Sequence, residues 1–361
     1  MQCSVAAPHD TAVTPAPCIL PAPLEDRRVP ALPDTAPLAA IDIGSNSFRL
    51  EIGEVRRGRY RRSEYLKRVV RLGAGLDADS RLTEPAAQRG LDCLTEFARH
   101  LEGFDPARVR AVATQTLREA ANRNDFLARA QGVLGLPIEV ISGREEARLI
   151  YAGVSFLQPC DEPRLVIDIG GRSTELILGR QRQPLSAESF PVGSVSLSMR
   201  YFGDGRMTAA AFRAAQVAAG AQFEEALAEF APARWREALG ASGTVGAVSD
   251  VLRASGITDG RITPPALAGL IERCLEAGDV RALQIAGLKE DRRAVIPGGL
   301  AILYTLAAHF GIATLWPAKG ALRQGVIDDL HERLNAGRRP AVTDMRDATV
   351  VELQARFGVD V

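Results

Sequence analysis

Several features that often assign a chain to a class are missing from this sequence. Its cysteines form no C-x-x-C pair, so neither a disulfide framework nor a zinc site is indicated for Cys3, Cys18, Cys93, Cys160 and Cys274. No apolar run approaches the roughly 18 residues of a membrane span, and the first residues lack the basic start and apolar core of a secretory signal. We therefore expect a cytoplasmic protein without a membrane partner.

An excess of charge of one sign is also missing. The 361-residue chain carries 44 basic and 44 acidic residues, so its formal net charge is zero. This balance argues against a surface tuned as a whole for nucleic acid or an anionic membrane. We expect no nucleic-acid partner, and any polyanion must be bound at a local site. The length is sufficient for two domains, each with its own core.

What the sequence does contain is a duplicated strand–turn–strand pattern. Residues 165–178 read LVIDIGGRSTELIL, and residues 38–50 read LAAIDIGSNSFRL. In both, two apolar runs flank a tight turn with glycine, which predicts a β-hairpin whose tip exposes backbone N–H groups, a carboxylate and hydroxyls. Such a tip suits phosphate and a metal ion. The repeat, with Asp42 and Asp168 126 residues apart, indicates a duplicated domain.

The predicted elements follow the same order in the two halves. Strands and helices alternate after each hairpin, so we expect an α/β fold with a mixed, helix-covered sheet in each half. The further strands are predicted at 60–70, 109–114, 137–141, 186–191 and 312–316. Helices are predicted to begin near 83, 115, 124, 142, 193, 208 and 320, and the helix from 208 is expected to reach 230.

The two ends of the chain differ from the middle. Residues 1–37 contain eight of the 21 prolines and show no sustained period, which predicts a disordered tail. Residues 333–361 are predicted to be a linker followed by one helical segment at 344–357.

Two regions carry groups that can bind an anion. The strand at 60–70 is rich in Arg and Lys, most of which we assign to a solvated face; Arg71, beside the turn at 72–76, is the strongest functional candidate there. The second region is the Gly/Ser/Thr turn at 240–247, where a helix N-terminus offers unpaired N–H groups. Its candidate residues are Gly243 and Thr244.

Three carboxylates of the hairpins are candidate metal ligands. Asp42 and Asp168 sit at strand ends, where a carboxylate can be aimed into a cleft. Asp168 and Glu175 across the hairpin suit a hard cation such as Mg²⁺, which takes oxygen ligands. The alternatives are a turn-forming Asp beside Gly and an outward-facing strand residue at Glu175.

The segment ISGREEARLIY at 141–151 places two acids in the first turn of a helix. Interaction with the helix dipole explains acids at such positions in most proteins. The functional alternative is a general base, whose pKa burial would raise toward neutrality. Helical spacing alone does not choose between Glu145 and Glu146.

Seven segments together resemble the exopolyphosphatase and guanosine pentaphosphate phosphohydrolase (Ppx/GppA) family. The resemblance covers about residues 38–332, and it is specific only as a combination, since D-x-G turns recur across the actin, sugar kinase and heat-shock ATPase superfamily. The matching segments are 40–48, 113–118, 141–151, 166–176, 240–244, 297–303 and 320–325.

The resemblance implies two actin-like (ribonuclease H-like) domains, at 38–150 and 151–332, with a cleft between them. It implies hydrolysis of a terminal phosphoanhydride with Glu146 as the base, and Asp168 and Glu175 as metal-linked acids. It also implies that Arg118 contacts phosphate. The residues that fall on the two phosphate loops are Ser45, Asn46, Ser47, Gly170, Gly171 and Ser173.

The sequence departs from this family at two places. The family's second hairpin usually reads G-G-G-S or G-G-A-S, where glycine permits a positive φ or a close backbone approach, and Arg172 stands at the third position here. This guanidinium either adds a phosphate ligand or obstructs the cleft, and we favour the ligand. Longer relatives continue into an all-helical C-terminal domain, whose first helix is expected about where this chain stops.

From the sequence we expect a Mg²⁺-dependent exopolyphosphatase acting on inorganic polyphosphate. Guanosine pentaphosphate 5′-phosphohydrolase uses the same site chemistry and remains an alternative, as does a non-catalytic polyphosphate or nucleotide sensor. A sugar kinase or ATPase is disfavoured because it gives Glu146 no role. The sequence does not fix the oligomeric state, for which a homodimer is one candidate.

Overall fold

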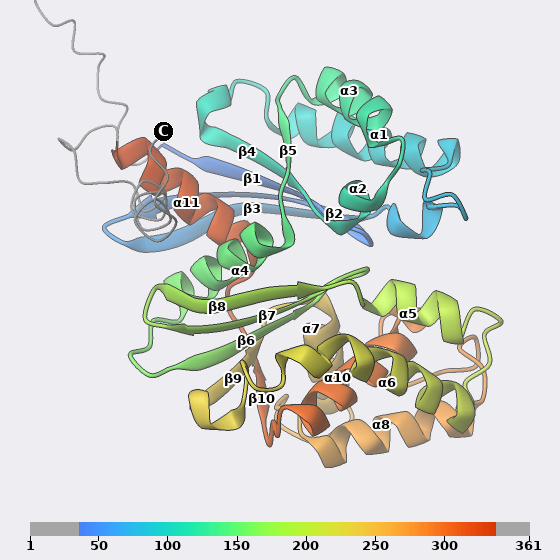
Figure 1. Cartoon of the computed structure of the whole chain (residues 1–361). Helices are drawn as coiled ribbons and strands as arrows, with labels where there is room; N and C mark the ends of the chain where they lie inside the picture. Colours follow the sequence, from blue (N-terminus) through green and yellow to red (C-terminus); the bar gives the residue numbers. More distant parts are fainter. Residues whose placement is uncertain (1–35, 337–361) are drawn as a thin grey trace, which may run out of the picture. The chain divides into compact units, whose positions relative to one another are not determined.

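The computed structural model describes residues 36–336 of the chain. Its first sheet contains β1 (Leu38–Ile43), β2 (Ser47–Arg56), β3 (Arg59–Val69), β4 (Val109–Ala113) and β5 (Ile138–Val140). The strand order is β3-β2-β1-β4-β5 (Figure 1). β1, β2 and β3 are antiparallel neighbours, whereas β4 and β5 run parallel to β1 and to each other.

The second sheet repeats this plan with the next five strands. It contains β6 (Arg164–Ile169), β7 (Thr174–Arg180), β8 (Gln183–Phe190), β9 (Glu237–Gly240) and β10 (Leu315–Pro317), in the order β10-β9-β6-β7-β8. β6 pairs antiparallel with β7 and parallel with β9, as β1 does with β2 and β4. The duplicated α/β plan is confirmed, and both sheets have the actin-like, ribonuclease H-like topology.

Helices cover the outer face of each sheet. The first sheet packs against α1 (Glu84–His100) and α3 (Arg123–Leu134), and the short α2 (Gln115–Glu119) follows β4. The second sheet packs against α5 (Ser194–Tyr201), α6 (Ala209–Phe223), α7 (Gly243–Ala254), α8 (Pro264–Ala277) and α10 (Ile296–His309). The one-turn α9 (Glu290–Arg293) precedes α10. No helix in residues 36–336 is long and apolar enough to cross a membrane.

Two helices, α4 (Gly143–Leu157) and α11 (Leu322–Ala336), pack against inner-face residues of both sheets. Their apolar side chains share one core cluster with Leu38 and Ala40 of β1 and Val166 of β6. They cross closely, because a β-carbon at Gly325 would overlap the carbonyl oxygen of Leu149. Since side chains alternate along a strand, Asp42 lies on the face of Ala40 and Asp168 on the face of Val166. Both acids are therefore directed toward the space between the sheets.

A few boundaries differ from those predicted. The helix from 208 gives way to a 3₁₀ turn at Glu224–Ala226, and Phe223, Ala226 and Phe230 all enter the core. The carbonyl of Ala36, a residue that the sequence assigned to the tail, accepts a hydrogen bond from Arg108 Nη1 at 2.8 Å. The predicted division between residues 150 and 151 falls inside α4. Residues 1–35 and the predicted helix at 344–357 lie outside the described residues.

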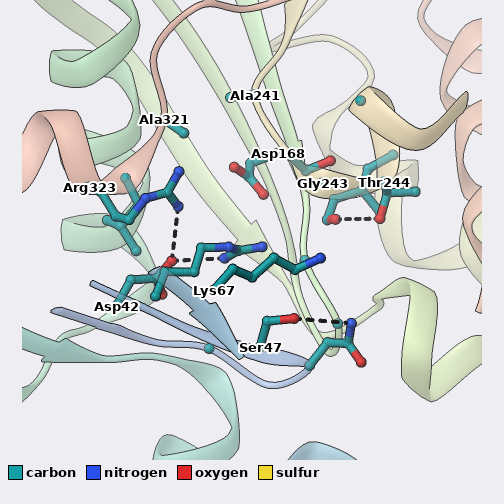
Figure 2. Close-up of a pocket in the computed structure, with 18 of the residues that line it drawn as sticks. Asp42, Ser47, Lys67, Asp168, Ala241, Gly243, Thr244, Ala321 and Arg323 are labelled. Carbon is teal, nitrogen blue, oxygen red and sulfur yellow. Dashed lines mark hydrogen bonds and ion pairs between the residues drawn. The ribbon is translucent and has the colours of Figure 1, made fainter. Parts of the chain in front are cut away.

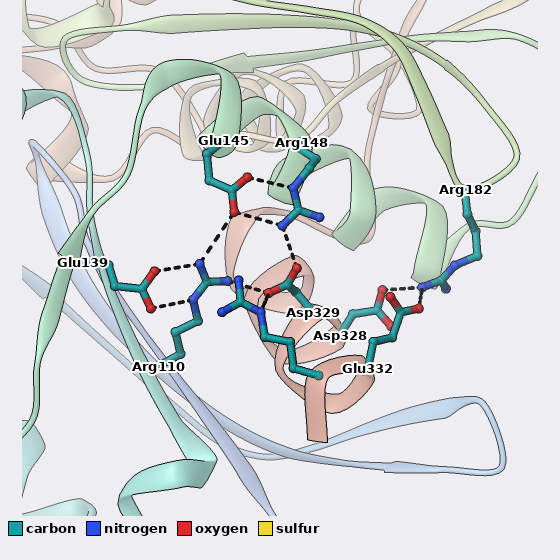
Figure 3. Close-up of polar contacts among 9 residues, drawn as sticks. Arg110, Glu139, Glu145, Arg148, Arg182, Asp328, Asp329 and Glu332 are labelled. Atoms are coloured by element: carbon teal, nitrogen blue, oxygen red, sulfur yellow. Dashed lines mark hydrogen bonds and ion pairs between the residues drawn. The ribbon is translucent and has the colours of Figure 1, made fainter. Parts of the chain in front are cut away.

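An ion-pair network ties α4 and α11 to the first sheet (Figure 3). Asp329 of α11 pairs with Arg110 of β4 at 2.8 Å, with Arg148 of α4 at 2.6 Å and with Arg333 at 2.6 Å. Burial alone would raise the pKa of Asp329, but Arg148, Arg333 and Arg110 together hold it below its ordinary value. Asp329 is therefore the carboxylate that all three guanidinium groups share, although Arg110 also pairs with Glu139 and Arg148 also pairs with Glu145.

We predict that Asp329→Asn lowers the free energy of unfolding by about 2–3 kcal/mol, because three partly buried guanidinium groups lose their shared carboxylate. A carboxylate with a lowered pKa stabilises the fold above its unfolded pKa of about 4 and loses that effect as the pH falls through its folded pKa. The difference from the parent should thus be largest near neutral pH and shrink in acid, which urea unfolding at several pH values measures.

The control is Glu332→Gln on the same helix. Glu332 pairs with Arg182 at 2.6 Å, and both side chains are about half exposed. Exposed pairs of this kind contribute about 0–1 kcal/mol. Equal losses of stability in the two variants would contradict the role assigned to Asp329.

Candidate active site

One cavity, with a volume of about 460 Å³, is lined by both hairpin tips and by the N-terminal ends of α4, α7 and α11 (Figure 2). This volume lies within the range of ligand sites, roughly 300–1,000 Å³. Eleven of the predicted site residues line it: Asp42, Ser45, Asn46, Ser47, Glu146, Asp168, Gly170, Gly171, Ser173, Gly243 and Thr244. Four others do not: Arg71, Arg118, Arg172 and Glu175.

The tips of the two hairpins meet at this cavity. A β-carbon at Gly171 would lie 2.9 Å from the β-carbon of Ser45, so the approach requires glycine there. In the described chain, the backbone N–H groups of Ser45, Asn46, Gly171 and Ser173 donate no hydrogen bond. Unpaired N–H groups gathered at turns bind anions. The two tips thus bring together unpaired N–H groups of the kind that can bind an anion, and phosphate binding there stays a prediction.

Backbone contacts from neighbouring segments hold the tips in place. The N–H groups of Arg71 and Gly73 donate to the carbonyls of Asn46 and Ser45, at 2.9 and 2.8 Å. Ser194 donates to the carbonyl of Gly170 from both its N–H and its hydroxyl, at 2.9 and 3.0 Å. The side chain of Arg71 is exposed and does not line the cavity. Arg71 therefore differs from our expectation: its backbone, with a positive φ of 55°, supports the loop.

Glu146 lies in the first turn of α4, and its carboxylate reaches the cavity. The helix begins after Ser142, whose hydroxyl accepts the N–H of Glu145 at 3.2 Å. Glu146 is only 7 % exposed, and its Oε2 accepts a hydrogen bond from Arg118 Nη1 at 2.8 Å. Burial raises the pKa of Glu146 to about 7, against the opposing effect of Arg118. A carboxylate with a pKa near neutrality is suited to act as a general base.

Arg118 differs from the role that the resemblance implied. Its guanidinium does not line the cavity. Nη1 donates to Glu146 and, at 2.9 Å, to the carbonyl of Ile141. In this structure Arg118 holds the Glu146 carboxylate from outside the cavity wall.

Asp168 and Glu175 are register partners on β6 and β7. Desolvation raises the pKa of Asp168 to about 6, with Arg49 opposing and Asp42 adding to the shift. Glu175 is 1 % exposed; its Oε1 accepts the hydroxyl of Ser189 at 2.8 Å, whereas its buried Oε2 accepts no hydrogen bond. Desolvation, followed by the charges of Glu146 and Asp168, raises the pKa of Glu175 well above its ordinary value.

Asp42 is occupied by basic side chains. Its Oδ2 pairs with Arg49 at 2.9 Å and with Arg323 at 3.4 Å. We expected Asp42 to be a metal ligand, but here it neutralises and orients two guanidinium groups.

The remaining acids, Asp168 and Glu175, fit Mg²⁺ only if substrate phosphate supplies further ligands. Among residues 36–336, no three His, Cys, Asp or Glu side chains are placed to hold a metal ion together. Mg²⁺ is, however, usually bound through one or two carboxylates together with substrate phosphates. Asp168 lines the cavity, and the unpartnered Oε2 of Glu175 is a buried oxygen donor beside it in the sheet. This pair fits a cation that enters with phosphate.

Basic side chains that we did not single out from the sequence dominate the cavity wall. Two of them, Arg62 and Lys67, come from β3, whose cations we had assigned mostly to solvent. A register shift opposite Ile52 and Gly53 leaves Ser63 unpaired, which brings Arg62 onto the face of Tyr65 and Lys67. Strand alternation in the sequence could not reveal this bulge. The complete basic set is Arg49, Arg62, Lys67, Lys289, Arg292, Lys319 and Arg323.

The turn that precedes α7 lies where the sequence placed it. Ser242 caps the helix by accepting the N–H of Val245, and the Thr244 hydroxyl donates to the carbonyl of Ile169 at 2.9 Å. A β-carbon at Gly243 would lie 2.6 Å from Nη2 of Arg292. The N-terminus of α7 and a guanidinium therefore converge on one part of the cavity.

Arg172 does not line the cavity, and its guanidinium contacts other parts of the protein. Its Nε and Nη2 contact Glu119 Oε2 at 2.7 and 2.6 Å, and its Nη1 donates to the carbonyl of Gly73 at 3.1 Å. Glu119 and Gly73 belong to the first half of the chain. In this structure the guanidinium therefore bridges the second hairpin to the first half, outside the cavity wall.

The fold and the site together define a class: an actin-like protein with two repeated sheets and a polar cavity lined by both hairpin tips. The model of the Ppx/GppA phosphatase family matches residues 61–334. The chain belongs to this family and is therefore a phosphatase by class.

Solved structures of family members share the fold. An exopolyphosphatase-like protein is 26 % identical over 83 % of this chain and 99 % of its own, with a TM-score of 0.73. An exopolyphosphatase from Cytophaga hutchinsonii is 24 % identical over 82 % and 98 %, with a TM-score of 0.74. The Aquifex aeolicus PPX-GPPA enzyme is 24 % identical over 81 % and 99 %, with a TM-score of 0.67.

We predict that Glu146→Gln lowers turnover about 10²-fold or more, because it removes the basic carboxylate and keeps the shape of the side chain. Substrate binding should survive. In the parent, turnover should rise with pH through about 7, because the raised pKa leaves Glu146 protonated and inactive at lower pH. Steady-state phosphate release between pH 5 and 9 measures both effects.

Glu145→Gln is the control for this substitution. Glu145 pairs with Arg148 at 2.8 Å and does not line the cavity. Its loss should leave turnover close to that of the parent. Parental turnover in Glu146→Gln would remove this residue as the base.

Proposed function

We propose that the protein releases terminal phosphate from inorganic polyphosphate, with Glu146 as the general base. One observation carries this proposal: the buried Glu146 carboxylate lines the same cavity as the unpaired N–H groups of both hairpin tips. A phosphate held by these N–H groups would lie within the cavity that also holds the base. Phosphoryl transfer requires mostly positioning and charge stabilisation from the protein.

In the proposed reaction, Glu146 takes a proton from a water molecule as that water attacks the terminal phosphorus. The bond from phosphorus to the bridging oxygen breaks, and the shortened chain leaves on that oxygen. Arg118 fixes the direction of the Glu146 carboxylate through its 2.8 Å hydrogen bond. The N–H groups of the tips stabilise the charge on the non-bridging oxygens.

The charge of the cavity wall supports a polyanionic substrate. Seven basic side chains line it against four acidic ones. Burial, together with Arg49, lowers the pKa of Arg292, whose side chain forms no ion pair with the described residues. Burial and the charge of Arg292 likewise lower the pKa of Lys67. The repulsion between crowded cations of this kind is reduced when they bind the phosphates of a chain.

The cavity favours a polyphosphate chain over a nucleotide. Among the described residues that line it, Tyr65 is the only aromatic side chain. The guanidinium groups of Arg62 and Arg323 lie over its ring, at 5.3 and 5.2 Å from the centroid. Tyr65 is thus already engaged, and a guanine base would need another stacking partner. Guanosine pentaphosphate remains the second candidate, because its phosphates suit the same cations.

Mg²⁺ is the cofactor that we propose for this site. Asp168, with Glu175 beside it, would hold the ion together with substrate phosphate. When bound, Mg²⁺ would neutralise charge on the phosphates.

The substrate proposal is tested by measuring phosphate release from long-chain polyphosphate and guanosine pentaphosphate side by side with purified protein. We expect a higher kcat/KM for polyphosphate. A preference for the nucleotide would select the second candidate. Binding of polyphosphate without release of phosphate would make the protein a sensor and contradict the enzyme proposal.

We further predict that activity vanishes in excess chelator and returns when Mg²⁺ is restored. Asp168→Asn should lower the apparent affinity for Mg²⁺, because it removes one charged oxygen donor. A titration of activity against Mg²⁺ measures this change. Full activity in excess chelator would rule out the metal part of the proposal.

A further inference from the structure

A continuous chain of side-chain contacts leads from the second hairpin to the candidate base. Arg172 contacts Glu119 Oε2 through Nε at 2.7 Å, and Glu119 Oε1 accepts Nε2 of Gln115 at 2.6 Å. Gln115 Oε1 in turn accepts Nε and Nη2 of Arg118, at 2.9 and 2.6 Å. Arg118 Nη1 then donates to Glu146 Oε2 at 2.8 Å. Five residues thus connect a phosphate-binding turn to the base.

The side-chain amide of Gln115, in the middle of this series of contacts, has a defined orientation. Gln115 has one donor group and one acceptor group on the same amide. Glu119, an acceptor, engages the amide nitrogen, so the amide oxygen faces Arg118. Both contacts would be lost if the amide turned over, because its nitrogen would then face a guanidinium. The charge of Arg172 holds Glu119 at the position where it sets this orientation.

The far end of the chain is equally constrained. One edge of the planar Arg118 guanidinium is held by Gln115, and Nη1 is held by Glu146 and the Ile141 carbonyl. The guanidinium therefore cannot rotate without breaking contacts on both sides. Because Arg118 supplies the hydrogen bond that orients Glu146, an error in the position of Arg118 becomes an error in the position of the base.

Arg172 is the member of this chain that comes from the other half of the protein. It stands in the turn between β6 and β7, next to Gly171 at the cavity wall, whereas Gln115, Arg118 and Glu119 belong to α2. The Arg172 and Glu119 side chains are 21 % and 26 % exposed, so water screens their ion pair only in part. The contact thus depends on the hairpin lying against α2.

We propose that Arg172 is a positioning residue for the reaction, which acts through Glu119, Gln115 and Arg118 to align Glu146. The alignment of the base is thereby coupled to the docking of the phosphate-binding hairpin on the first half of the chain. This inference rests on the proposed function, because it requires Glu146 to be the base. It differs from a ligand role, since the guanidinium acts on the protein and leaves the substrate to the N–H groups.

The test compares Arg172→Met, Glu119→Met and the double variant with the parent in steady-state phosphate release from polyphosphate. Each single substitution removes one side of the ion pair and keeps an unbranched side chain; Arg172→Met also removes the Nη1 hydrogen bond to the Gly73 carbonyl. We expect kcat to fall about tenfold in each, with KM changed less than about twofold, because misalignment of a general base lowers catalysis and leaves binding intact. The double variant should be no slower than either single variant, because both substitutions break one chain.

Two further variants separate positioning from a general structural effect. Arg172→Lys retains a cation that can reach Glu119 and should recover part of kcat. Arg129→Met is the matched control, since it removes a bidentate pair with Glu84, at 2.7 and 2.9 Å, elsewhere in the first half. This control should keep the parental kcat. Thermal melting of each variant verifies that the fold is retained.

The outcomes distinguish this inference from the proposed function. An active parent with an unchanged kcat in Arg172→Met overturns the positioning role and leaves the proposed function standing. A rise in KM at unchanged kcat, confined to Arg172→Met, identifies a substrate ligand and also overturns it. If the losses of kcat in the two single variants add up in the double variant, the two residues do not act through one series of side-chain contacts. A parent that releases no phosphate from either substrate overturns both proposals.

Discussion

The hydrogen bond between Arg118 and Glu146 is the contact on which the chemistry proposed for this site depends. Burial raises the pKa of the Glu146 carboxylate to about 7, and a buried carboxylate without a hydrogen-bond partner would be costly. Arg118 supplies that direction at 2.8 Å without entering the cavity. The guanidinium also donates to Gln115 and to the carbonyl of Ile141. The carboxylate edge that faces the cavity stays available for water.

The charged residues on the inner faces of the two sheets are distributed differently in the two halves. Asp42, Arg49 and Lys67 occupy adjacent register positions on β1, β2 and β3, and Arg323 from α11 pairs with Asp42 and Glu51 above them. Acids of the first sheet thus organise cations, whereas the equivalent positions of the second sheet, Asp168 and Glu175, are both acidic. The duplicated hairpins have diverged into a cationic side and an acidic side. A phosphate chain with its cation matches this division.

Much of the fold was predictable because its signals are local. The two I-D-I-G hairpins, the alternation of strands and helices, and the Ser142 cap of α4 each depend on residues close in sequence. Such short-range patterns are fixed by strand period, turn chemistry and capping. The 3₁₀ turn at Glu224–Ala226 was missed because the core, which takes Phe223, Ala226 and Phe230 together, overrode helix propensity. The bulge at Ser63 was missed because the strand partner defines it.

The sequence by itself determined which groups are present at the hairpin tips, that the two halves are copies, and that an acid begins α4. Only the tertiary structure decided which of these groups meet, because burial and pairing depend on segments far apart in the chain. It paired Asp42 with Arg49 and Arg323, and it brought Lys67 and Arg292 to one wall. It also placed Arg172 on Glu119, which lies 53 positions earlier. Which carboxylate a guanidinium meets depends on the folded positions of both side chains, and their separation in the sequence does not give that distance.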